Sequence, residues 1–110
     1  MEYHNMTDGE IAERIAKIIG LNTASQGGKA VLHVKNGIWT LFDPCNNPAD
    51  AWPIIVNNGI SLECIVVNRH EKTWRAQFKT AYVKHRVNHK NRLRAAMIVF
   101  LMMQESKNAS

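Results

Sequence analysis

A run of apolar residues near the C-terminal end of the chain limits how this protein can fold. From Leu93 onward, apolar side chains recur at the spacing of one helical face, and further apolar residues widen this stripe. The longest uninterrupted run, residues 95–103, has about half the length that a membrane-spanning helix needs. We expect a helix that opens near Asn88 or Asn91. It must be covered on most sides, either by a sheet or by a second copy of the chain.

Two local signals predict structure in the first half of the chain. Thr7 and Glu10 have the spacing of a capping box, apolar residues follow with helical periodicity, and Gly20 is a standard stop. We therefore expect a helix over residues 8–19. The dipeptide Asn36-Gly37 lies between two apolar stretches and suits a type I′ turn, which predicts an antiparallel hairpin within residues 29–42. The polar segment 22–28 between them is expected to be a flexible loop.

The segment 43–59 combines residues that start and stop a helix. Asn47 followed by a proline, with Asp50 three positions after Asn47, has the order of an N-cap and an acidic first turn. Pro53 complicates this interpretation because, inside the helix, it removes one hydrogen bond. Either the helix kinks at Pro53, or Asp50 is the true cap and the first turn is irregular.

Alternating apolar residues predict two more strands, at 60–67 and 73–78, and residues 81–83 either extend the second or begin a third. The resulting order of helix, hairpin, helix, hairpin and helix leaves too few residues for parallel crossover units. We therefore expect one domain spanning residues 1–110. Its fold class is α+β, with a small antiparallel sheet of four to five strands packed with two to three helices in a sandwich-like arrangement.

Positive charge is concentrated in one part of the chain. The net charge is +5, but residues 69–94 contain nine Lys or Arg and one acid, so that the rest of the chain is slightly acidic. Such a segment indicates an anionic partner, although charge runs also occur as plain solvated surface. The candidate residues for an anionic partner are Arg69, Lys72, Arg75, Lys79, Lys84, Arg86, Lys90 and Arg92.

Aromatic residues lie among these cations. Trp74, Phe78 and Tyr82 could stack on bases, although the same spacing on a strand also describes a core face. For the tryptophans, including Trp39 and Trp52, we expect core positions rather than stacking surfaces.

The sequence contains no assembled catalytic constellation. It lacks the spacing of a phosphate-binding loop and of a nucleophile elbow. His85 and His89 have a spacing that could chelate a metal on a helix, but the cations around them oppose a bound dication. We therefore expect no catalytic residues, no metal and no cofactor, and a hydrolase or nuclease is the weakest hypothesis. Cys45 is expected to be a free loop cysteine and Cys64 a free cysteine in the core.

Two segments carry a family resemblance. The sequences FDPCNNPADAWPIIVNNGISL, residues 42–62, and RLRAAMIVFLMMQE, residues 92–105, resemble the NinX-like family of small accessory proteins of lambdoid phages and prophages. The motif CNNPADAWPII, residues 45–55, is the most distinctive part. The resemblance implies a phage-encoded protein made in the cytoplasm of a bacterial host and a small sandwich domain. It supplies no catalytic residues, because the family is one of unknown function.

Together these observations favour a non-enzymatic binding module that modulates a host or phage factor, either a protein or a nucleotide. The alternative is nucleic-acid binding through residues 69–94. We expect no membrane partner, and the C-terminal helix is the expected place for any contact between copies. Candidate partner-binding residues in the distinctive motif are Cys45, Asn46, Asn47, Asp50 and Trp52, although the motif serves the fold as readily as it serves binding.

Overall fold

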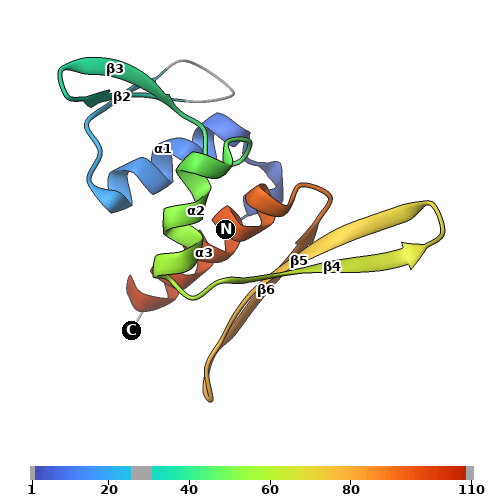
Figure 1. Cartoon of the computed structure of the whole chain (residues 1–110). Helices are drawn as coiled ribbons and strands as arrows, with labels where there is room; N and C mark the ends of the chain where they lie inside the picture. The colour runs from blue at the N-terminus through green and yellow to red at the C-terminus, as the bar shows by residue number, and fades with distance from the viewer. Residues whose placement is uncertain (1, 26–30, 109–110) are drawn as a thin grey trace.

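The computed structural model describes residues 2–25 and 31–108 (Figure 1). The elements in chain order are the 3-10 helix η1 (Tyr3–Asn5), α1 (Asp8–Ile19), β1 (Thr23–Ser25), β2 (Val31–Lys35), β3 (Ile38–Phe42), α2 (Pro48–Asn57), β4 (Ser61–Asn68), β5 (Glu71–Lys79), β6 (Lys84–His89) and α3 (Arg92–Asn108). The described strands form two antiparallel sheets, β1–β2–β3 and β4–β5–β6. The α+β class is confirmed, but there are two sheets of three strands where one sheet of four to five was expected.

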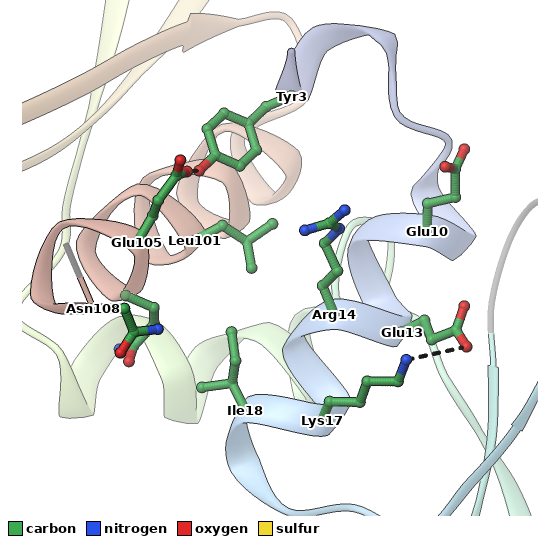
Figure 2. A pocket seen from close by; sticks show the side chains of 10 residues that line it. Tyr3, Glu10, Glu13, Arg14, Lys17, Ile18, Leu101, Glu105 and Asn108 are labelled. Carbon is green, nitrogen blue, oxygen red and sulfur yellow. Dashed lines mark hydrogen bonds and ion pairs between the residues drawn. The ribbon is translucent and has the colours of Figure 1, made fainter. Parts of the chain in front are cut away.

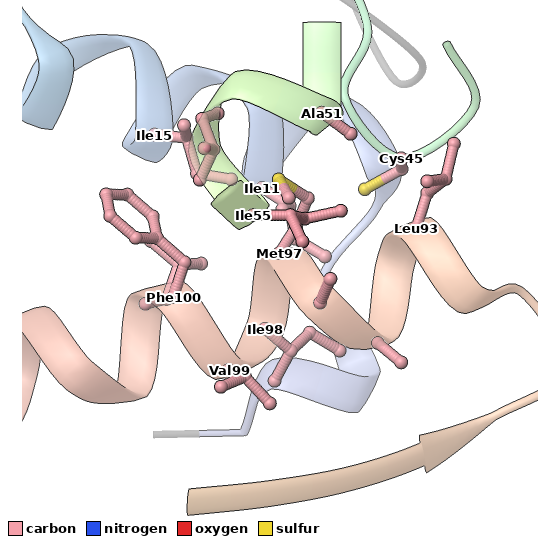
Figure 3. Close-up of a cluster of buried hydrophobic side chains, with 14 of the residues drawn as sticks. Ile11, Ile15, Cys45, Ala51, Ile55, Leu93, Met97, Ile98, Val99 and Phe100 are labelled. Atoms are coloured by element: carbon pink, nitrogen blue, oxygen red, sulfur yellow. The ribbon is translucent and has the colours of Figure 1, made fainter. Parts of the chain in front are cut away.

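Helix α3 occupies the centre of the core. It contacts α1 and α2 on one side and β5 and β6 on the other, and Figure 1 shows it between these layers. In Figure 3, Met97 lies among side chains from α1 and α2, whereas Ile98 and Val99 point the other way. All three are fully buried, and every residue from Leu93 to Leu101 is buried. The sheet and the other helices of the same chain therefore cover this apolar helix, rather than a second copy.

The predicted helix over residues 8–19 is confirmed as α1. The Thr7 Oγ1 accepts a hydrogen bond from the backbone N–H of Glu10 at 3.0 Å, and the Glu10 carboxylate accepts one from the Thr7 N–H at 3.1 Å. At the other end, Gly20 adopts φ +83°, the left-handed conformation that ends the helix. Ile11 and Ile15 on its inner side are fully buried.

The β2–β3 hairpin is also confirmed. Asn36 and Gly37 both have positive φ, as the type I′ turn requires, and Lys35 pairs with Ile38 directly beside the turn. The expected loop at 22–28 contains the short strand β1, which pairs with β2, and residues 26–28 lie outside the described residues.

Helix α2 begins at the first of the two proposed caps. The Asn47 Oδ1 accepts a hydrogen bond from the Ala49 N–H at 3.0 Å, and Pro48 occupies the first helical position. The helix continues through Pro53, which is an exposed residue. The alternative in which Asp50 caps the helix is therefore wrong.

Four other expectations need correction. Residues 84–89 form strand β6, so the C-terminal helix does not open near Asn88, the first of its two expected starts. Cys64 is exposed on β4 rather than buried in the core. Trp52 is 58% exposed and Trp39 is 52% exposed, so neither is a core anchor. Cys64 and Trp39 follow the alternation of their strands, but the covering layer does not extend over them. Trp52 lies beside the buried stripe of α2, which is formed by Ala51, Ile54 and Ile55.

Candidate anion-binding face

The distinctive motif at residues 45–55 is held in place by hydrogen bonds within the protein. The Asn46 Nδ2 donates to the carboxylates of Asp8 at 3.0 Å and Asp43 at 3.1 Å. The Asn91 Nδ2 donates to the Cys45 carbonyl at 2.7 Å, and the Asp50 carboxylate accepts from the Asp43 N–H at 2.9 Å. The motif therefore connects the starts of α1, α2 and α3.

The start of α3 completes this cluster. The Asn91 Oδ1 accepts hydrogen bonds from the N–H groups of Leu93 and Arg94 and so caps the helix. Arg94 is buried, and its Nη1 lies 2.6 Å from Asp8 Oδ1. Its Nη2 donates to the Met6 carbonyl at 2.6 Å. The cation of Arg94 is thus neutralised inside the protein.

The acids of this cluster have opposite pKa shifts. Burial alone raises the pKa of Asp8, but hydrogen bonds from Asn46 and Arg94 and the charge of Arg94 outweigh it, and the pKa falls below its usual value. Burial raises the pKa of Asp43, and the neighbouring carboxylates of Asp8 and Asp50 add to this increase against the hydrogen bond from Asn46. The fold therefore disfavours the ionised form of Asp43.

The five partner-binding candidates in the motif differ in what they present to solvent. Cys45 is fully buried, and burial raises the pKa of its thiol far above the usual value, so the thiolate is disfavoured. The side chains of Asn46, Asn47 and Asp50 are engaged in the hydrogen bonds of the cluster and the α2 cap. Trp52 lies on the exposed side of α2. The contacts of this motif thus serve the fold, and among its five candidates Trp52 alone offers a large apolar surface.

The sheet β4–β5–β6 distributes the cations of residues 69–94 between its two faces and its ends. Successive side chains of a strand point to opposite faces, and Ala76 and Val87 on the inner face are buried against α3. The alternate positions form the outer face. We define the basic face as the following polar residues of this outer face: Ser61, Glu63, Arg75, Gln77, Lys79, Lys84, Arg86 and Asn88.

The strand register brings the cations of the basic face together. Lys79 lies opposite Lys84, and Gln77 lies opposite Arg86. Arg75 connects all three strands, because its guanidinium donates to Glu63 on β4 and to Asn88 on β6, both at 3.4 Å. A shallow cavity of about 520 Å³ lies on this face and is lined by Ser61, Leu62, Glu63, Arg75, Gln77, Lys84 and Arg86. Three cations and one carboxylate therefore line one hollow, which favours an anion.

The remaining predicted cations lie elsewhere. Arg69 and Lys72 are at the β4–β5 turn, and Lys90 follows β6. The guanidinium of Arg92 lies over the ring of Trp74, 5.5 Å from its centre. The structure thus brings together four of the eight predicted cations and does not include the other four.

The aromatic residues do not lie on the basic face. Trp74 and Phe78 share the inner face with Ala76 and are half-buried, so they offer no stacking surface beside the cations of the basic face. Tyr82 is exposed in the turn between β5 and β6. Gln77 and Asn88 are members of the face that sequence reasoning missed. Their alternation with buried Ala76 and Val87 would have revealed them, had residues 84–89 been recognised as a strand.

A second cavity, of about 620 Å³, lies between α1 and the C-terminal part of α3 (Figure 2). Charges of both signs line it, including Glu10, Arg14 and Lys17, and Lys17 pairs with Glu13 at 3.9 Å. The Tyr3 hydroxyl donates a hydrogen bond to Glu105 at its edge. Because the charges are mixed, this cavity favours neither anions nor cations.

Two further observations concern metals and membranes. Within residues 2–25 and 31–108, no group of three His, Cys, Asp or Glu side chains is placed to hold a metal ion. His85 and His89 lie on a strand rather than on a helix, so their spacing is not that of neighbouring helical turns. Among the described helices, none is both long enough and apolar enough to cross a membrane.

Comparison with known proteins identifies the family. A search of curated proteins found no similar sequence. A family model described as bacteriophage P22, NinX, matches residues 2–104, which includes the cavity on the basic face and the whole β4–β5–β6 sheet. The described fold thus falls almost entirely within the matched region, and the chain belongs to the bacteriophage P22 NinX family, which makes it a phage accessory protein.

Proposed function

We propose that this protein is a non-enzymatic binding module whose basic face binds the phosphate backbone of a nucleic acid. The observation that carries the proposal is the placement of Arg75, Lys79, Lys84 and Arg86 on one side of an exposed sheet. Each cation that neutralises a phosphate releases condensed counterions, and this release supplies most of the affinity in nonspecific binding.

The chemistry of the face favours backbone contacts over base recognition. Arginine side chains match the geometry of phosphate oxygens, and lysines act as mobile point charges. Gln77 and Asn88 add neutral polar groups that can reach phosphate or sugar oxygens. The half-buried Trp74 and Phe78 on the opposite face do not stack on a ligand held here. We therefore expect little dependence on base sequence.

The non-enzymatic part of the proposal is supported by how the acids and the buried thiol are used. Asp8, Asp43 and Asp50 are engaged in hydrogen bonds that join the helices. Burial disfavours the thiolate of Cys45. Glu63 on the basic face is paired with Arg75. These groups hold the structure and are not arranged as an acid and base around a shared reacting atom.

The test measures binding of fluorescent oligonucleotides, single-stranded and duplex, at a series of salt concentrations. The double variant Lys84→Ala, Arg86→Ala is expected to bind more weakly on all sequences. The slope of log affinity against log salt should fall by about two for duplex DNA, since each neutralised phosphate contributes about 0.9. The matched control is Arg14→Ala, Lys17→Ala, which removes the same charge from exposed positions on α1.

Three outcomes decide the proposal. A loss confined to the basic-face variant supports it. An equal loss in the α1 control would mean that only net charge matters, and the basic face would not be the site. The proposal would be overturned if the wild-type protein bound neither single-stranded nor duplex oligonucleotides at low salt. It would also be overturned if the protein bound a mononucleotide as tightly as an oligonucleotide.

A further inference from the structure

Strand β3 forms an open edge of its sheet with an unusual composition. It pairs with β2 on one side, and within the described residues no strand pairs with its other side. Ile38, Trp39 and Leu41 are 67%, 52% and 58% exposed. None of the five residues of β3 is charged. Exposed edge strands of soluble monomers usually carry a charge, a proline or a bulge that prevents pairing with another strand.

The backbone of β3 presents hydrogen-bonding groups toward this open edge. The Val34 N–H donates to the Asn22 carbonyl at 3.2 Å, on the side of β2 that faces away from β3. Val34 lies opposite Trp39, and because the Val34 N–H points away from β3, these two residues form a pair without mutual hydrogen bonds. The N–H and C=O of Trp39 therefore point away from β2. The same alternation directs the N–H and C=O of Leu41 outward.

The side chains add an apolar surface next to this edge. Trp39 and Leu41 share a face of the sheet with their cross-strand partners Val34 and Leu32. The opposite face, with Val31 and Phe42, is buried against the body of the protein. Figure 1 shows the hairpin at the outer side of α1, away from the β4–β5–β6 sheet. The exposed face and the open edge are therefore both accessible.

We infer that β3 is the contact between two copies of this chain. In an antiparallel pairing about a two-fold axis at Thr40, Trp39 of each copy lies opposite Leu41 of the other. The outward N–H and C=O groups of these two residues then meet in register, and Ile38 lies opposite Phe42. The three-stranded sheets of the two copies join into one sheet of six strands, and the exposed side chains of Trp39 and Leu41 from the two copies become neighbours.

A second copy fits this edge better than a charged partner. Each copy has a net charge of +5, but β3 itself carries no charge, so the strands can approach without like-charge contacts. The sequence Ile-Trp-Thr-Leu-Phe is apolar at both ends around a central Thr40 and is therefore compatible with itself when reversed. A contact of five residues covers less than the roughly 800 Å² per partner of a standard interface, so the dimer should be reversible.

Sedimentation over a range of protein concentrations tests the dimer, with Leu41→Pro as the blocking variant. Because the Leu41 N–H points away from β2, proline removes no hydrogen bond of the hairpin but deletes the donors to the second copy. Leu41→Ala is the matched control, since it shortens the side chain and keeps the N–H. Relative to this control, the proline variant should raise the dissociation constant roughly tenfold or more, for two lost hydrogen bonds.

Disulfide trapping tests the register independently. In a Cys64→Ser background, the two copies of Thr40→Cys would oppose each other with Cα atoms about 4.5 Å apart, close enough for a disulfide. The two copies of Ile38→Cys would be about four residues apart along the strands, roughly 13 Å, which is too far. Oxidation should therefore link Thr40→Cys into dimers and leave Ile38→Cys monomeric.

Several results would overturn the inference. One is a monomer at every concentration together with no linkage of Thr40→Cys. A dimer that Leu41→Pro leaves intact, or linkage that is equal at both positions, would place the contact elsewhere. If Leu41→Pro fails to fold, the comparison of the two cysteine variants decides the matter.

Discussion

The guanidinium of Arg94 lies 2.6 Å from the carboxylate of Asp8 and so joins the first turn of α3 to the first turn of α1. Backbone carbonyls of Tyr3 and Met6 accept further hydrogen bonds from the same side chain. An almost buried cation with this many partners fixes the N-terminal segment against the core. Within the basic segment, Arg94 thus has a structural position that separates it from the cations of the basic face.

Replacing Asp8 tests this pair. Asp8→Asn keeps the size of the side chain but leaves a buried guanidinium without its counter-charge, and we expect the free energy of unfolding at pH 7 to fall by about 3 kcal/mol. Asp43→Asn is the matched control. Because the fold raises the pKa of Asp43, its ionised form is disfavoured, and the neutral variant should be equally stable or slightly more stable. Urea denaturation measures both variants.

The same pair makes a contribution to stability that depends on pH. The pKa of Asp8 is lowered in the folded state, so its contribution is present above its unfolded pKa of about 4 and is lost as the pH falls through the folded value. Below that value wild-type Asp8 is uncharged, like asparagine. The difference between wild type and Asp8→Asn should therefore shrink as the pH falls. A constant difference down to strongly acidic pH would contradict the assigned role of the ion pair.

Core packing around α3 gives another prediction. Phe100 is 3% exposed and belongs to the hydrophobic core, so Phe100→Ala should lower the free energy of unfolding by about 3 to 5 kcal/mol through loss of burial and a residual cavity. Trp52→Ala removes an aromatic side chain of similar kind from an exposed position and should cost under about 0.5 kcal/mol. Thermal or urea denaturation compares them. Similar losses in the two variants would contradict the burial described for α3.

The two cysteines should differ in reactivity. Cys64 is exposed and Cys45 is buried, and both are free. A thiol-reactive reagent should therefore modify Cys64 rapidly in the native protein, whereas Cys45 should react only after denaturant is added. The variant Cys64→Ser identifies the site, because it should remove the fast reaction. Fast labelling that persists in this variant would show that the Cys45 thiol is accessible after all.

Local signals in the chain predicted most of the secondary structure. The capping box at Thr7, the Asn36-Gly37 turn and the cap at Asn47 each act over a few residues, so their effect does not depend on the rest of the fold. Strand β6 was missed because its alternation is carried by polar and charged residues around a single buried Val87. A strand with so few apolar residues differs little in sequence from a basic loop.

The sequence could predict the basic face only in part. The excess of cations between residues 69 and 94 is visible in the sequence, but its members have different surroundings. Arg94 is buried against Asp8, Arg92 lies over Trp74, and Arg86 is exposed on the basic face. Which of these positions a cation takes depends on the strand register and on the position of α3. Both of these involve residues that are distant in the sequence.

The sequence by itself determined the α+β class, the helix at Asp8–Ile19, the hairpin turn and the need to bury the C-terminal helix, because these follow from local backbone preferences and apolar periodicity. The tertiary structure alone decided that the strands form two sheets, that Trp39 and Trp52 remain exposed, and that four cations share one face. The physical reason is that periodicity specifies which side chains lie on the same side of an element. Whether that side is covered depends on which other elements pack against it.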